Sequence, residues 1–182
     1  MDHGTADQSP EILLSRFDIE QRVGELAAQI ARDYYGRTPH LIGILKGAWV
    51  FMADLIRHMN MDVTVDFLSI TSYGPTMQSS GEVKITKDLD VSIEKREVLI
   101  VEDILDTGRT LKFLQEVLCV HKPHSLRVVT LLNKRSRRIV PVHADYVGFE
   151  IADVFVVGYG LDFNQKYRQL PDIHILRTVP SP

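Results

Sequence analysis

Residues 98–111 read VLIVEDILDTGRTL, and this stretch decides the fold. Its first four residues are apolar and three of them are Val or Ile, which is typical of a strand buried on both faces in a parallel sheet. Two carboxylates, Glu102 and Asp103, stand where that strand runs out, and apolar residues at helical spacing begin at Leu111. The pattern predicts a strand, a short polar turn and then a helix.

The polar turn has the composition of a phosphate site. Gly108 lets the backbone approach a ligand, Thr107 and Thr110 can donate hydroxyl hydrogen bonds, and the first N–H groups of a helix point outward unpaired. Carboxylates repel phosphate, but Glu102 and Asp103 can accept hydrogen bonds from sugar hydroxyls or hold a hydrated Mg²⁺. The combination predicts a sugar-phosphate site.

A simpler interpretation is a capped helix after a core strand, with Asp106 as the N-cap and the two acidic residues in a solvated loop. However, the whole pattern of residues 98–111 resembles the phosphoribosyl pyrophosphate motif of the type I phosphoribosyltransferases. The length of the match favours the functional interpretation. The resemblance implies phosphoribosyl pyrophosphate as a substrate and Mg²⁺ as the cofactor.

Length and charge narrow the class of protein. We expect residues 1–182 to form one phosphoribosyltransferase domain, with residues 1–10 and 178–182 as flexible tails. The net charge of −3 argues against a nucleic-acid partner. No apolar run approaches the ~20 residues that span a bilayer, so no membrane partner is expected.

The compartment is predicted from the N-terminal segment and from the cysteine content. Residues 1–10 lack the apolar segment of a signal peptide, and the single Cys119 has no partner in the chain for a disulfide. A reducing, cytoplasmic location is therefore expected. Cys119 falls on the apolar side of the helix after the motif, which predicts a buried, inert thiol.

Upstream of the motif, apolar spacing predicts a covering helix. Asp18 and Gln21 resemble a capping box, and apolar residues follow at helical spacing until Gly36. A buried strand at 41–45 is followed by Lys46-Gly47 and a second apolar-periodic helix. A cation and a glycine at the end of a parallel strand lie where open α/β sheets bind ligands, so they are expected to face the phosphate site.

The remaining segments alternate between strands and polar connections. Residues 72–81 are a run of turn formers with a glycine near each end, which predicts a mobile lid loop. Further strands are predicted at 63–70, 82–86, 125–132, 146–150, 155–159 and 173–176. The alternation predicts an α/β fold. The resemblance implies the type I phosphoribosyltransferase form of it, a twisted, mainly parallel sheet flanked by helices, with a small hood formed by the chain termini.

Other segments resemble the hypoxanthine-guanine phosphoribosyltransferases, the 6-oxopurine branch of the family. They occur in the same order between about residue 41 and residue 175, at Leu45-Lys46-Gly47, Ser72-Tyr73-Gly74, Asn133-Lys134-Arg135, 147–151 and 156–164. The resemblance implies a purine-salvage enzyme that transfers 5-phosphoribosyl to hypoxanthine and/or guanine, giving IMP or GMP and pyrophosphate. It also implies a homodimer or homotetramer, because such assemblies are common in the family.

Each matching residue receives a role through the resemblance. Asp106 would be the base that accepts the purine N7 proton. The implied purine-binding residues are Lys134, Phe155, Val156 and Asp162. The implied phosphoribosyl pyrophosphate-binding residues are Leu45, Lys46, Gly47, Ser72, Tyr73, Glu102, Asp103, Asp106, Thr107, Gly108, Arg109, Thr110 and Arg168. The implied metal ligands are Glu102, Asp103 and Asp162. In relatives the peptide at Leu45–Lys46 can be cis, and the sequence leaves its state here open.

Several alternatives stay open. The basic cluster 133–138 could be a solvated loop or a surface for RNA, although it has no interleaved aromatic residues. Phe155 could be plain core and Asp162 a plain loop aspartate. The enzyme could use xanthine, adenine or a pyrimidine as its base, or the chain could be a non-catalytic regulator of the same fold that binds nucleotide or RNA.

Overall fold

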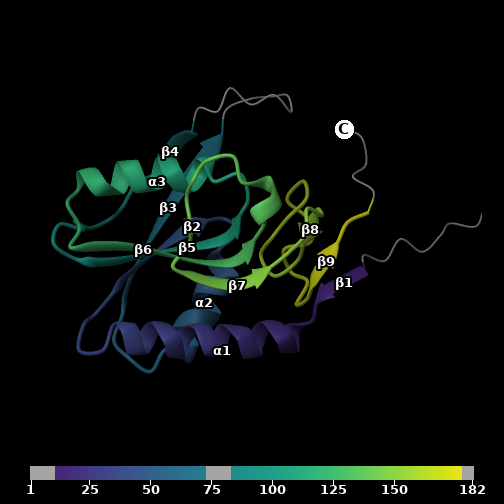
Figure 1. The fold of residues 1–182 in the computed structure, drawn as a ribbon, viewed down its shortest axis with the longest axis horizontal. Helices are drawn as coiled ribbons and strands as arrows, with labels where there is room; N and C mark the ends of the chain where they lie inside the picture. The colour runs from purple at the N-terminus through teal and green to yellow at the C-terminus, as the bar shows by residue number, and fades with distance from the viewer. Residues whose placement is uncertain (1–10, 73–82, 178–182) are drawn as a thin grey trace, which may run out of the picture.

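The computed structural model describes residues 11–72 and 83–177. Its centre is a six-stranded sheet in the order β4-β3-β2-β5-β6-β7, and a three-stranded hood, β1-β9-β8, lies beside it (Figure 1). The main strands are β2 (His40–Leu45), β3 (Thr64–Ser72), β4 (Val83–Lys87), β5 (Glu97–Leu105), β6 (Ser125–Asn133) and β7 (Tyr146–Glu150). The hood strands are β1 (Glu11–Leu14), β8 (Val156–Val157) and β9 (Ile173–Ile175). The helices are α1 (Arg16–Asp33), α2 (Trp49–His58), α3 (Arg109–Val120) and the short 3₁₀ helix η1 (Arg135–Arg137).

The main sheet is parallel except at one edge. The pairs β3-β2, β2-β5, β5-β6 and β6-β7 are parallel, and β4 runs antiparallel to β3. In the hood, β1 pairs antiparallel with β9, so segments from the two ends of the chain lie side by side. The predicted α/β fold, with a mainly parallel sheet and a hood from the termini, is confirmed.

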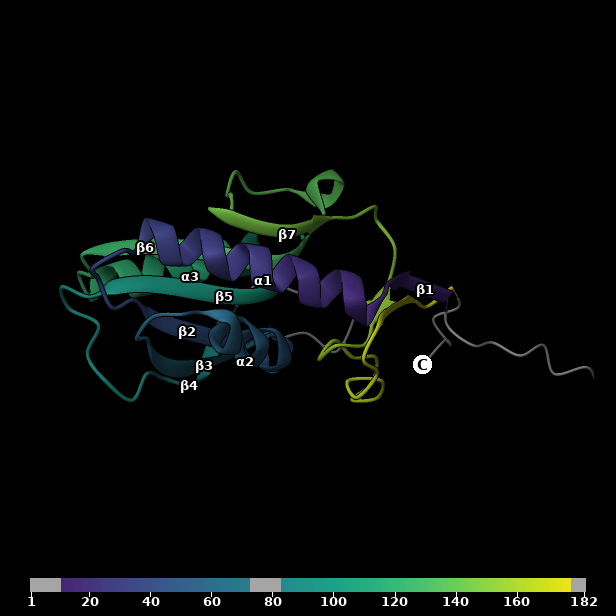
Figure 2. The same ribbon diagram turned by 90° about the horizontal axis from the view of Figure 1, so that it is seen from below.

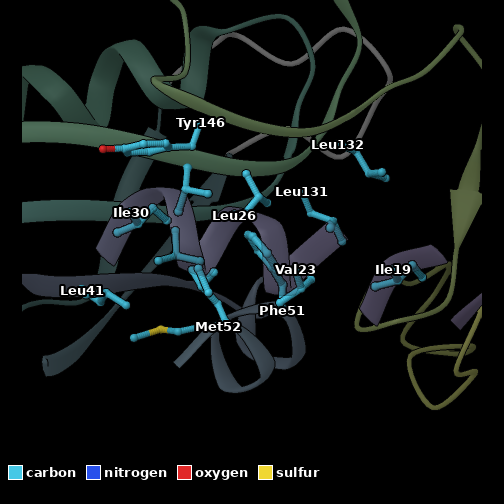
Figure 3. Close-up of a cluster of buried hydrophobic side chains, with 14 of the residues drawn as sticks. Ile19, Val23, Leu26, Ile30, Leu41, Phe51, Met52, Leu131, Leu132 and Tyr146 are labelled. Atoms are coloured by element: carbon cyan, nitrogen blue, oxygen red, sulfur yellow. The ribbon is translucent and has the colours of Figure 1, made fainter. Parts of the chain in front are cut away.

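Helices cover both faces of the sheet, with α1 and α2 on one face and α3 on the other (Figures 1 and 2). Successive strand residues point to opposite faces, so Leu99 and Val101 pack under α1 and α2 while Val98 and Ile100 pack under α3. Because both faces are covered, β5 is apolar without alternation, as its sequence indicated. Figure 3 shows the apolar cluster between the sheet and helices α1 and α2, in which Leu26 and its neighbours on α1 project toward the sheet and α2.

The start of α1 differs from the prediction. Ser15 is the N-cap, and Ser15 and Asp18 form the capping box between them, so Asp18 occupies the third helical position. The prediction that Asp18 caps the helix with Gln21 is wrong. The physical reason is that the Ser15 hydroxyl accepts from the Asp18 backbone N–H three residues ahead, which starts the helix one turn earlier.

Two other predictions need correction. Cys119 is exposed, because the buried positions of α3 are Leu111, Leu114 and Leu118 and Cys119 lies one residue past that stripe. The strand expected at 155–159 is only the two residues of β8, and it belongs to the hood. Within the described ranges, no helix has the length and apolar character needed to cross a bilayer.

The α1 side of the core offers a test of the packing. Leu26 is fully buried, so Leu26→Ala removes apolar contacts and leaves a cavity, and we expect the free energy of unfolding to fall by about 2–5 kcal/mol. Val120, on the outer side of α3, is 76% exposed and serves as the control, because Val120→Ala should change stability by less than about 0.5 kcal/mol. Urea unfolding measures both. Equal effects of the two variants would contradict this packing.

Candidate active site

Three neighbouring parallel strands end at the same edge of the sheet, and a functional candidate follows each one. Lys46 comes directly after β2, Asp106 directly after β5 and Lys134 directly after β6. The register pairs Leu105 with Asn133, so the residues that follow β5 and β6 start level with each other. Open α/β sheets bind ligands at this carboxyl edge. The predicted site residues are therefore brought together by strand pairing.

Two adjoining cavities occupy this edge. The first, of about 350 Å³, is lined by Glu102, Asp103, Asp106, Thr107, Gly108 and Thr110 among others. The second, of about 660 Å³, is lined by Lys46, Lys134, Arg137, Phe155, Asp162 and Arg168 among others. Gly47, Asp103 and Asp106 line both cavities. The phosphate turn and the predicted purine residues thus share one continuous site with Asp106 at the junction.

The first cavity contains the turn before α3. Gly108 is the N-cap at φ 87°, and a Cβ there would stand 2.7 Å from Val142 Cγ2, so only glycine fits. No side chain caps α3, and Asp106 is therefore not an N-cap as in the simpler interpretation. The backbone N–H groups of Ile139 and Val140 donate to the Thr107 carbonyl at 3.0 and 3.1 Å, which holds the turn from behind. Uncapped N–H groups at a helix start can bind a phosphate.

The acidic pair at the end of β5 is held in an unfavourable environment. Burial, and then the charge of Asp103, raise the pKa of Glu102 well above its usual range. Burial raises the pKa of Asp103 to about 6, while the Ile104 N–H and the positive charge of Arg168 oppose the shift. Asp103 also lies against Gly47, where a Cβ would be only 1.5 Å from Asp103 Oδ2. A bound cation would relieve the repulsion between these carboxylates.

No three His, Cys, Asp or Glu side chains in the described part of the chain converge as a ready-made metal centre. This fits a Mg²⁺ ion that is held mainly by substrate phosphates and by one or two carboxylates. Asp162 is engaged, because its Oδ1 pairs with Arg168 Nη2 at 2.8 Å and its Oδ2 accepts from the Gln165 N–H at 2.8 Å. These contacts order Asp162 at the edge of the second cavity, which it lines.

Two cations face the same side of the second cavity. Lys46 is exposed, and its Nζ lies 3.5 Å from Gln165 Oε1, which also accepts from Arg168 Nη2 at 3.3 Å. Arg168 Nη1 donates to the Gly160 carbonyl at 2.7 Å. The Leu45–Lys46 peptide is cis, which answers the question that the sequence left open.

The opposite wall of the second cavity carries the predicted purine residues. Lys134 is only 7% exposed, although the three residues that follow it, Arg135, Ser136 and Arg137, lie on the surface. Phe155 is 42% exposed and meets Phe163 edge to face, with ring centroids 5.6 Å apart, so it is not plain core. Val156 is buried in β8 directly after Phe155. This wall combines a buried cation with an accessible aromatic face.

Three predicted residues, Ser72, Tyr73 and Arg109, are not among the described residues that line the two cavities. Ser72 ends β3, and Tyr73 lies outside the described residues, as does nearly all of the predicted lid 72–81. Arg109 is the first residue of α3 and is exposed.

The structure adds two arginines that sequence reasoning did not place at the site. Arg137 forms an ion pair with Asp106, and the charge of Asp106 is the main cause of the raised pKa of Arg137. Arg138 donates to the carbonyls of Leu105 and Asp106 and thereby supports the phosphate turn. The sequence signal that could have placed these two arginines at the site was the position of the basic cluster 133–138 at the end of a predicted strand.

Comparison with known proteins agrees with this geometry. A family model described as phosphoribosyl transferase domain matches residues 11–164. The hypoxanthine-guanine phosphoribosyltransferase of Bacillus subtilis is 49% identical over 93% of this chain and 94% of its own length. The chain belongs to this family. It is a phosphoribosyltransferase of the hypoxanthine-guanine branch, as the sequence motifs predicted.

Solved structures of the branch superpose over nearly the whole phosphoribosyltransferase chain. A hypoxanthine phosphoribosyltransferase of Staphylococcus aureus has a TM-score of 0.90 at 46% identity, covering 97% of this chain and 96% of its own. The enzyme of Trypanosoma cruzi, solved with the product IMP, has a TM-score of 0.86 at 43% identity, covering 94% and 96%.

The raised pKa of Asp103 predicts a cost to stability that depends on pH. The pKa lies above the ordinary value of 3.8, so the folded protein binds more protons than the unfolded chain between pH 3.8 and about 6. The ionised carboxylate therefore destabilises the fold fully above pH 6, and this cost vanishes as the pH falls toward 4. We expect Asp103→Asn to raise the free energy of unfolding by roughly 1–3 kcal/mol at pH 8 and by much less at pH 4.

Urea unfolding with a chelator present measures this effect without bound metal. Asp62→Asn, which removes an exposed carboxylate far from the site in the sequence, is the control and should change stability little at either pH. A gain for Asp103→Asn that is equally large at both pH values would contradict the burial of this charge.

Proposed function

We propose that this chain transfers the 5-phosphoribosyl group from phosphoribosyl pyrophosphate to hypoxanthine and/or guanine, giving IMP or GMP and pyrophosphate in purine salvage. The observation that carries the proposal is the junction of the two cavities. Asp106 stands between a phosphate-binding turn and a wall that bears Lys134 and Phe155. A sugar phosphate in the first cavity would present its C1 to a base in the second.

The first cavity would hold the ribose 5-phosphate. Its charge would be met by the uncapped N–H groups at the start of α3 and by the hydroxyls of Thr107 and Thr110. Glu102 and Asp103, at the end of β5, would accept hydrogen bonds from the ribose hydroxyls. The close packing of Asp103 against Gly47 supports this arrangement, because it places a carboxylate between the ribose and pyrophosphate subsites.

Lys46, Gly47 and Arg168 would bind the pyrophosphate that leaves. The single oxygen of Gln165 that lies near both cations supports this role, since it occupies a position suited to an anion. One or two of the predicted metal ligands Glu102, Asp103 and Asp162 would hold Mg²⁺ together with the substrate phosphates, because these carboxylates do not converge as a group of three in the described part of the chain. Bound Mg²⁺ would neutralise charge that develops on the pyrophosphate.

The purine would lie against Phe155 with its O6 and N7 toward Lys134 and Asp106. The ammonium of Lys134 donates to a 6-oxo group, the Val156 carbonyl can accept from the purine edge, and Asp106 accepts the N7 proton as the base attacks C1. The low exposure of Lys134 supports the assignment, because a buried cation needs a polar partner.

An RNA-binding regulator is less well supported. Arg135 pairs with Glu150 at 3.0 Å, Arg137 pairs with Asp106 and Asp153, and Arg138 is bound to backbone carbonyls. The three arginines of the cluster are thus engaged within the protein and Lys134 is buried, so the cluster does not present a free surface for phosphates.

We further propose that residues 1–182 act as one domain, in the cytoplasm, as a homodimer or homotetramer. A structural study of the Trypanosoma cruzi relative concerns the effect of its C-terminal region on oligomeric state.

The base role of Asp106 predicts a selective loss of rate. Asp106→Asn keeps the shape of the side chain but cannot take a proton, so kcat should fall by about 10²–10⁴-fold. The affinity for phosphoribosyl pyrophosphate should change little, because the turn N–H groups remain. Steady-state kinetics and calorimetric titration with phosphoribosyl pyrophosphate and Mg²⁺ measure the two effects. A loss in kcat below about threefold would move the base to another residue.

Base choice tests the function and the role of Lys134 together. With phosphoribosyl pyrophosphate and Mg²⁺, a panel of free bases should give nucleotide from hypoxanthine or guanine and negligible product from adenine, since an ammonium meets the 6-amino group donor to donor. Lys134→Gln should lower 6-oxopurine kcat/KM and narrow the gap to adenine, because an amide can present its carbonyl. If the variant left both quantities unchanged, Lys134 would have no part in purine binding.

A further inference from the structure

Arg137 lies between two acidic side chains at the mouth of the purine cavity. Its Nε is 3.0 Å from Asp106 Oδ1, and its Nη1 is 3.3 and 3.4 Å from the two carboxylate oxygens of Asp153. Asp106 follows β5, whereas Asp153 precedes Phe155 on the purine wall. The guanidinium therefore joins the phosphate turn to the wall that holds the base.

Arg137 contacts the Asp106 carboxylate at its Oδ1 oxygen. Oδ1 of Asp106 is buried and no well-aligned hydrogen bond reaches it from the described residues, so the ion pair with Arg137 is what balances this oxygen. Within the same ranges, no hydrogen bond is donated to Oδ2. One carboxylate oxygen is thus held while the other is left to accept a proton.

Arg137 and Lys134 belong to the same turn. The Arg137 N–H donates to the Lys134 carbonyl at 3.2 Å, and the Lys134 N–H donates to the Leu105 carbonyl at 2.9 Å, one residue before Asp106. A 6-oxopurine carries its O6 and N7 side by side on one edge. One short turn therefore sets both the donor for O6 and the orientation of the acceptor for N7.

We propose that Arg137 is a positioning residue that holds Asp106 Oδ1 so that Oδ2 faces the purine N7, with Asp153 anchoring the guanidinium. The proposal rests on the proposed role of Asp106 as the base. A base that is oriented by a third group is a recurrent arrangement in enzymes, because proton transfer requires a fixed geometry. Arg137 touches the base and acts through it.

The role predicts an effect on rate with little effect on folding. The side chains of Arg137 and Asp106 are 46% and 37% exposed, and ion pairs with this exposure contribute little to stability. Arg137→Met should therefore keep Tm within about 2 °C of wild type while lowering kcat by about 10–50-fold, within the range for general-base help. The KM for phosphoribosyl pyrophosphate should stay within about twofold, because the phosphate turn is untouched.

Two further variants make the comparison specific. Arg137→Lys keeps the charge but not the planar fork that spans Asp106 and Asp153, so it should recover only part of the lost kcat and fall between Arg137→Met and wild type. Arg135→Met is the matched control, because Arg135 belongs to the same turn but pairs with Glu150 and is directed away from Asp106. It should leave kcat within about twofold of wild type. Asp153→Asn should lower kcat in the same direction as Arg137→Met and by a smaller factor.

The decisive measurement is the double variant with Asp106→Asn. If Arg137 acts through the Asp106 carboxylate, adding Arg137→Met to Asp106→Asn should lower kcat by less than about twofold further. A further loss as large as that in the wild-type background would show an independent role and overturn the proposal, as would an unchanged or increased kcat for Arg137→Met alone. An Asp106→Asn variant with normal kcat would instead overturn the base assignment itself, so the two failures are distinguishable.

Discussion

The pairing of β5 with β2 on one side and β6 on the other is the constraint on which the site depends. Parallel pairing brings three strand ends to one edge, and the residue that follows each end is Lys46, Asp106 or Lys134. The order of the strands therefore places the acidic residues at the end of β5 between Lys46 and Lys134. A shift of one residue in either pairing would turn every strand side chain to the other face and separate these groups.

The packing on the two faces of the sheet maintains that register. Leu99 and Val101 are fixed under α1 and α2, and Val98 and Ile100 are fixed under α3, so β5 cannot slide without exposing one set. Glu102 and Asp103, which follow Val101 in the same strand, are consequently held where burial opposes their charge. The stable core supports a site that is electrostatically unfavourable until ligands and cations arrive, which is common where function and stability compete.

The phosphoribosyltransferase site combines residues of the main sheet with residues of the segment that joins β8 to β9 in the hood. The proposed phosphate subsite lies at the end of the sheet and the start of α3, whereas the residues around Asp162 and Arg168, between β8 and β9, are held by hydrogen bonds and ion pairs between polar side chains and backbone. Gly160, at φ 96°, packs against the Gly47 carbonyl, where a Cβ would be 2.5 Å away. This close approach couples the hood to the Lys46-Gly47 turn, which we propose binds pyrophosphate, because no larger residue than glycine fits at position 160.

The sequence by itself determined the strand, turn and helix of residues 98–111, the α/β alternation and the family, because each of these signals lies in residues that are adjacent or regularly spaced. The start of α1 was misassigned by one turn, since Ser15 and Asp18 present two plausible caps that only the folded backbone distinguishes. The contact of Arg137 with Asp106 and the burial of Lys134 were decided by the tertiary structure. In the sequence, Lys134 and Arg137 belong to a basic cluster that is typical of a solvated loop. Only the register of β5 with β6 places that cluster beside the acidic turn. There, Arg137 pairs with Asp106 because of its charge, whereas Lys134 is buried in the wall of the second cavity.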